Sequence, residues 1–119
     1  MNANDISRLL LPEGVLANFA VTKFTESQAA IDLYLEEKNQ KPEEFQSDKL
    51  VSKGFFDEIT IQDFPIRGRS VFLHIKRRRW LNERTGDTVF RNWTMVAKGT
   101  RKTTEFASFL KAISGYKTR

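Results

Sequence analysis

The sequence contains no cysteine and only one histidine among its 119 residues. The lack of cysteine excludes disulfides and cysteine-ligated metals, and a single imidazole is too few for an ordinary zinc site. The apolar runs, of which residues 9–11 are an example, fall far short of the ~20 residues that a membrane-spanning helix needs. The first residues lack a basic region followed by a long apolar core, so we expect no signal peptide and a cytoplasmic protein.

Sequence motifs for catalysis are also missing. The chain has no phosphate-binding glycine loop, no G-x-S-x-G motif and no Cys–His pair. We therefore expect no enzymatic activity, no catalytic residue, no cofactor and no bound metal, and we expect His74 to be a structural or surface residue. One alternative, a small nuclease, stays open on residues of unspecific spacing: Asp57, Glu58, Asp63 and Lys76.

The charged residues are distributed unevenly along the chain. Up to Asp63 there are six Lys and Arg against twelve Asp and Glu, whereas from Phe64 onward there are fourteen against three. Such an asymmetry between halves points to a nucleic acid or another anionic surface as the partner. The alternative is that the acidic half neutralises the basic half inside one fold, because charge sign informs about association and not about fold.

The hydrophobic pattern predicts a single domain, residues 1–119, that contains both strands and helices. Alternating apolar and polar residues predict strands over these ranges: 29–37, 58–63, 70–79, 88–96 and, more weakly, 20–25. Short helices are expected over residues 6–11 and 15–19, and a longer one over residues 104–113. We expect an α+β fold in which the short N-terminal helices and the C-terminal helix cover an antiparallel sheet of four or five strands, with a basic β-hairpin.

The most unusual stretch is residues 76–80, KRRRW, where a strand ends in four adjacent cations and an indole. Strand alternation predicts that Arg77 and Arg79 share one face. Lys76 and Arg78 would then share the other. The apolar side of the strand must therefore leave the core near Arg77, so we expect the hairpin to extend into solvent as a two-stranded arm. Such a ribbon fits the major groove of duplex DNA; the alternative is a charged edge that deters strand aggregation.

These features predict a DNA-binding surface in which Lys and Arg contact phosphates, which gives affinity without sequence information. Trp80 and Trp93 are candidates for stacking on bases or on arginines, and packing in the core is the alternative for both. Phosphate contacts would serve RNA as well as DNA. The predicted contact residues are Arg67, Arg69, Lys76, Arg77, Arg78, Arg79, Trp80, Arg91, Lys98, Arg101 and Lys102.

Four stretches carry a family resemblance: residues 9–14 (LLLPEG), 59–68 (ITIQDFPIRG), 71–80 (VFLHIKRRRW) and 99–106 (GTRKTTEF). Together they resemble the N-terminal region of bacterial insertion-sequence transposases in which a zinc ribbon precedes a helix-turn-helix and a separate catalytic domain. The relatives have cysteines before the D-x-P-I-x-G turn and just after the arginine run. This chain has none, so zinc binding is not implied.

The resemblance implies an accessory part of a transposase, encoded apart from the catalytic domain, that recognises the terminal DNA of the element. It supports DNA contact by the residues that match the motif: Lys76, Arg77, Arg78, Arg79 and Arg101. The implied partners are element DNA and a separately encoded catalytic transposase subunit. A different class of function also fits, namely a protein-interaction module whose basic half docks on an acidic patch of that subunit.

Overall fold

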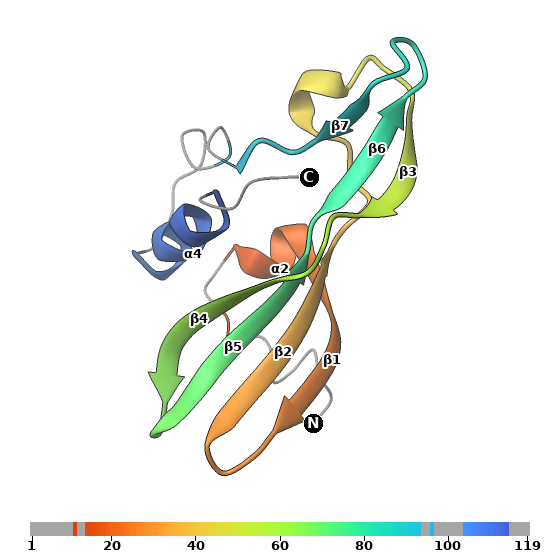
Figure 1. Ribbon diagram of the computed structural model, residues 1–119. Coiled ribbons are helices and arrows are strands. Elements are labelled where there is room, and N and C mark those ends of the chain that lie inside the picture. The colour runs from red at the N-terminus through yellow and green to blue at the C-terminus, as the bar shows by residue number, and fades with distance from the viewer. Residues whose placement is uncertain (1–10, 12–13, 94–95, 97–103, 115–119) are drawn as a thin grey trace.

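The computed structural model describes residues 11, 14–93, 96 and 104–114 of the chain (Figure 1). Over these residues it is a mixed α+β fold dominated by strands, with seven strands in two sheets and a C-terminal helix, α4 (Thr104–Ser114). No helix in the described part of the chain is long and apolar enough to cross a membrane. The helix predicted over residues 6–11 lies outside the described residues, apart from Leu11, which is buried.

The first sheet contains four strands in the order β1 (Phe19–Glu26), β2 (Ala30–Glu37), β5 (Arg69–Lys76) and β4 (Ile59–Ile66). The β1–β2 and β4–β5 pairs are antiparallel, as expected for hairpins, but β2 and β5 run parallel. The predicted purely antiparallel sheet is therefore wrong. Alternation identifies which residues face the core, but it does not say which distant strand becomes the neighbour.

The second sheet contains β3 (Leu50–Phe55), β6 (Arg78–Asn82) and β7 (Thr88–Phe90), all antiparallel. Figure 1 shows it beyond the end of the first sheet, with β6 continuing the direction of β5 and the short 3-10 helix η1 (Glu43–Phe45) beside it. The expected return strand over residues 88–96 is shorter than predicted, because β7 ends at Phe90 and Trp93 already lies in a helical turn.

The core lies between one face of the first sheet and the helices α2 (Val15–Asn18) and α4 (Figure 1). The predicted spacing of apolar residues in α4 is confirmed, since all four of them are buried: Phe106, Phe109, Leu110 and Ile113. Gly14 precedes α2 with φ +100, and a Cβ there would lie only 2.8 Å from the Phe106 ring. Glycine is thus required where α2 approaches α4.

Candidate nucleic-acid interface

The basic run crosses from one sheet to the other, and its alternation changes phase there. Lys76 ends β5 on the exposed face, Arg77 is buried at 5% exposure, and Arg79 is exposed again. Arg77 and Arg79, which alternation predicts on one face, therefore differ in exposure, although their guanidinium carbons lie 5.6 and 5.9 Å from the Phe56 ring centroid. Arg77 lies between the two strands, where its carbonyl accepts a hydrogen bond from the Phe56 N–H at 2.8 Å. The sequence does not reveal where one strand ends and the next begins here, because neighbouring side chains in the run are alike.

Arg78 and Arg91 converge on Glu37, which ends β2 with 1% of its surface exposed. The Arg91 Nε donates to Glu37 Oε2 at 2.9 Å, and the backbone N–H of Arg78 donates to Oε1 at 3.0 Å. The Arg78 Nε also donates to the Glu37 carbonyl at 3.0 Å. Two predicted DNA contacts are thus engaged in joining the sheets.

The electrostatics of this cluster reflect its burial. Burial raises the pKa of the Glu37 carboxyl above its ordinary value, while the hydrogen bonds from Arg91 and from the Arg78 N–H oppose the shift. Arg78 and Arg91 are further held by Ser52 Oγ and the Gln40 carbonyl, respectively. The cluster therefore positions the second sheet relative to the first.

Both tryptophans lie in the interior, as the packing alternative proposed. Trp80 is 1% exposed and Trp93 is 6% exposed. The Trp80 Nε1 donates to Asn39 Oδ1 at 2.8 Å, and Trp93 stacks on Phe19 with ring centroids 5.2 Å apart. In this structure neither indole presents a face to a nucleic acid base.

Carboxylates from the acidic half neutralise part of the basic half. Three such pairs are Arg69–Glu26 at 2.7 Å, Arg84–Asp48 at 2.7 Å and Arg91–Glu37. Hydrogen bonds from Arg84 and from Asn82 hold the pKa of the Asp48 carboxyl below its usual value. For these arginines the alternative of internal neutralisation holds.

Three of the predicted contact residues remain exposed and form no ion pair with a described carboxylate: Arg67, Lys76 and Arg79. Lys98, Arg101 and Lys102 lie outside the described residues. Lys53 was missed because it belongs to β3, a strand without clear alternation, in the acidic half. It is exposed, and its carbonyl accepts a hydrogen bond from the Arg79 Nε at 3.1 Å.

The exposed aromatic side chains also differ from those that the sequence suggested. Phe64 is 59% exposed on β4, and Phe90 is 42% exposed at the end of β7. Phe90 is the register partner of Arg79 and packs edge-to-face against the buried Phe56, with ring centroids 5.4 Å apart. An exposed phenylalanine has no sequence signature, because the same residue type fills the core.

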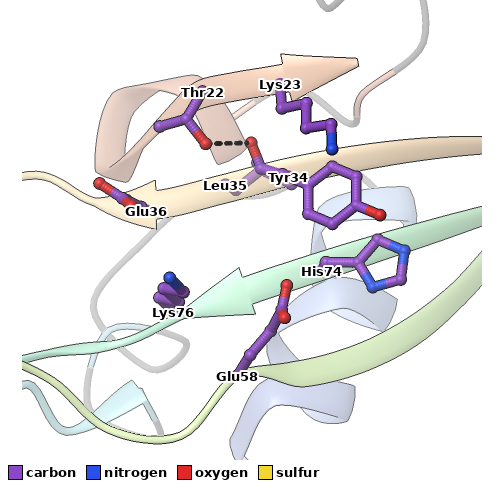
Figure 2. Close-up of a pocket in the computed structure, with 8 residues that line it drawn as sticks. All are labelled: Thr22, Lys23, Tyr34, Leu35, Glu36, Glu58, His74 and Lys76. Carbon is purple, nitrogen blue, oxygen red and sulfur yellow. Dashed lines mark hydrogen bonds between the residues drawn. The ribbon is translucent and has the colours of Figure 1, made fainter. Parts of the chain in front are cut away.

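The face of the first sheet opposite to α2 and α4 carries a row of neighbouring side chains across all four strands, and Figure 2 shows three of them: Lys23, Tyr34 and His74. Lys23 Nζ lies 5.2 Å from the centroid of the Tyr34 ring, which stacks on His74 at 4.4 Å. Thr60 completes the row, with Oγ1 3.2 Å from His74 Nδ1. The row borders a shallow hollow of about 310 Å³ that Glu58 and Lys76 also line.

His74 is fixed from both ring nitrogens. Its Nε2 lies 2.7 Å from Asp32 Oδ1, and because a carboxylate only accepts, Nε2 carries the hydrogen. In the neutral ring Nδ1 then accepts the Thr60 hydroxyl. The order Asp–His–Thr matches that of a carboxylate, a base and a hydroxyl nucleophile, but Tyr34 stacking and cross-strand pairing account for the arrangement as a structural one.

Of the residues named for the nuclease alternative, Asp63 lies apart from Glu58 and Lys76. Glu58 and Lys76 line the hollow of Figure 2, whereas Asp63 lines a groove beside α4 with Phe109. Among the residues that the structure describes, no three His, Asp or Glu side chains gather as metal ligands would. No known protein family, curated protein or solved structure matches this chain.

Proposed function

We propose that this protein binds DNA as the accessory N-terminal part of an insertion-sequence transposase whose catalytic domain is encoded separately. The family resemblance and the charge difference between the halves support this proposal. The observation that carries it is the set of exposed cations near the junction of the sheets, Lys53, Lys76 and Arg79, which form no ion pair with any described carboxylate.

The half-buried and the exposed arginines have separate roles in this proposal. Arg78 and Arg91 bind Glu37 and keep the second sheet in place. Lys76 and Arg79 are three positions apart, so a regular alternation of buried and exposed residues would expose only one of them. Both reach solvent because that alternation changes phase between them. The exposed cations contact phosphates, which gives affinity that depends on salt and not on base sequence. Arg67, at the turn between β4 and β5, is an exposed cation at a second place on the molecule.

Salt-dependent binding tests the proposal. Fluorescence anisotropy with labelled DNA from about 50 to 300 mM salt should give a linear fall of log K with log salt concentration. Changing Lys53, Lys76 and Arg79 together to alanine should make that slope shallower by ~2.7, because each lost phosphate contact removes ~0.9. The matched control changes Lys38, Lys49 and Lys111 instead, with the same loss of charge.

The two triple variants separate a local surface from overall charge. Equal effects of both would mean that net charge alone attracts DNA and that the junction has no special role. Absence of binding by the unchanged protein, or binding that does not respond to salt, would contradict the proposed function itself.

A second candidate function is docking on the catalytic transposase subunit, which the surroundings of Phe64 favour. A groove of about 340 Å³ lies between β4 and α4, and Phe64 beside it is 59% exposed. Size-exclusion chromatography with the catalytic subunit, with and without DNA, distinguishes the two functions. If docking occurs without DNA, Phe64→Ser should weaken it and leave DNA binding unchanged.

A further inference from the structure

We propose that Phe90, with Arg79 beside it and Lys53 on the next strand beyond Arg79, forms a base-stacking subsite that takes an unpaired nucleotide. This inference rests on the proposed function and adds a preference to it: the protein binds single-stranded or locally unpaired DNA more tightly than a continuous duplex.

The ring of Phe90 is supported from within. It is 42% exposed, yet it packs edge-to-face on Phe56, with an interplanar angle of 84° and centroids 5.4 Å apart. Phe56 is only 8% exposed and has the Arg77 and Arg79 guanidinium carbons 5.6 and 5.9 Å from its ring centroid. An exposed aromatic on a rigid base of this kind loses little conformational freedom when a ligand stacks on it.

The phosphate-binding groups lie next to this ring. Arg79 is the register partner of Phe90 across the β6–β7 ladder. Its Nε donates to the Lys53 backbone carbonyl at 3.1 Å, which holds the guanidinium beside β3, the strand that carries Lys53. Neither cation forms an ion pair with a described carboxylate. An aromatic ring beside cations that no described carboxylate neutralises is the combination that single-strand binding proteins use.

The chemistry of Phe90 selects an unpaired base. In a duplex the base faces are already stacked, and only their edges are offered in the grooves. Phenylalanine has no donor or acceptor with which to read an edge, so its contribution requires a free base face. The flanking positive charge favours a polyanion over an apolar protein surface as the occupant.

The test compares a labelled single strand of about 20 nucleotides with the duplex of the same sequence, at ~50 mM salt. Phe90→Leu should weaken single-strand binding about tenfold, because one base loses its aromatic partner. Binding to the duplex should change less than about twofold. Phe90→Trp should retain the single-strand affinity, and its fluorescence should be quenched on binding. Phe64→Leu, at the other strongly exposed phenylalanine, is the control and should bind as the unchanged protein does.

A further test uses a single strand in which one base is missing. The unchanged protein should bind this strand more weakly than the intact one. Phe90→Leu should reduce the affinity for the abasic strand less than it reduces the affinity for the intact strand. An equal loss on single strand and duplex, or no loss at all, would overturn the stacking subsite while leaving DNA binding intact. If the unchanged protein binds neither nucleic acid, the proposed function fails and the subsite fails with it. Thermal unfolding of Phe90→Trp checks that the fold is retained.

Discussion

Arg77 and Arg79 are two residues apart in one run of arginines, and they differ in their exposure to solvent. Their guanidinium carbons lie 5.6 and 5.9 Å from the Phe56 ring centroid, but Arg77 is 5% exposed whereas Arg79 reaches solvent. At the scale of single residues, position relative to the break between the sheets decides what each guanidinium can do. The residue type alone does not.

The first prediction compares these two arginines. Arg77→Ala should lower the free energy of unfolding by about 2 kcal/mol, because the buried stem and its packing are lost. Arg79→Ala should change stability by less than about 0.5 kcal/mol and make the salt dependence of DNA binding shallower by ~0.9. Urea unfolding and anisotropy measure the two effects. The reverse pattern would contradict the exposures on which the interface is based.

Glu37 gives the second prediction at this scale. Glu37→Leu should cost about 3 kcal/mol in unfolding free energy, because it leaves the half-buried Arg91 guanidinium without its carboxylate partner. Glu37→Gln should cost less, since it keeps an acceptor oxygen and resembles the neutral acid that burial favours. Chemical denaturation of both variants tests the order. Equal stability of Glu37→Leu and the unchanged protein would show that the cluster does not join the sheets.

At the scale of elements, the connection between η1, β3 and the β6–β7 turn depends on Asp48. Its carboxylate accepts hydrogen bonds from Arg84 Nε at 2.7 Å and from Asn82 Nδ2 at 3.0 Å. These bonds connect the loop before β3 to the end of β6 and to the turn that follows it. They therefore fix the β6–β7 turn to the loop before β3.

The third prediction concerns pH. The folded pKa of Asp48 is below its ordinary value of 3.8, so the unfolded chain binds its proton first as the pH falls. The stabilisation is fully present above that ordinary value and is lost as the pH falls through the lower folded value. Thermal unfolding of the unchanged protein and of Asp48→Asn should therefore converge between about pH 5 and pH 2. A constant difference between them would mean that the Asp48–Arg84 pair contributes nothing to stability.

The elements also show what the sequence could and could not predict. Strong alternation predicted β2, β4 and most of β5, and helical spacing predicted α4, because each pattern reports which residues face a core. The parallel β2–β5 pairing was missed because it is set by packing between distant segments. β3 was missed because Gly54 and Lys53 interrupt its apolar residues. At the candidate interface, composition identified the basic run, but only the break at Arg77 determined which cations reach solvent.

At the scale of the whole molecule, carboxylates of the acidic half neutralise some of the described cations of the basic half but not others. The molecule is elongated, with extents of 49 × 26 × 26 Å, and the second sheet forms one end of it (Figure 1). Carboxylates of the acidic half neutralise Arg69, Arg84 and Arg91. The exposed cations Arg67, Lys76 and Arg79 have no such partner among the described residues, and in the proposed function they are the groups that attract a polyanion.

Lysine footprinting tests this account most directly. The protein is treated with an amine-reactive reagent with and without DNA, and the modification of each lysine is measured by mass spectrometry. Lys53 and Lys76 should lose most of their reactivity when DNA is bound, whereas Lys49, which is ion-paired with Glu83, and Lys111 on α4 should react equally in both samples. Protection that is uniform over all four lysines, or absent from Lys53 and Lys76, would contradict a DNA-binding surface at the junction of the two sheets.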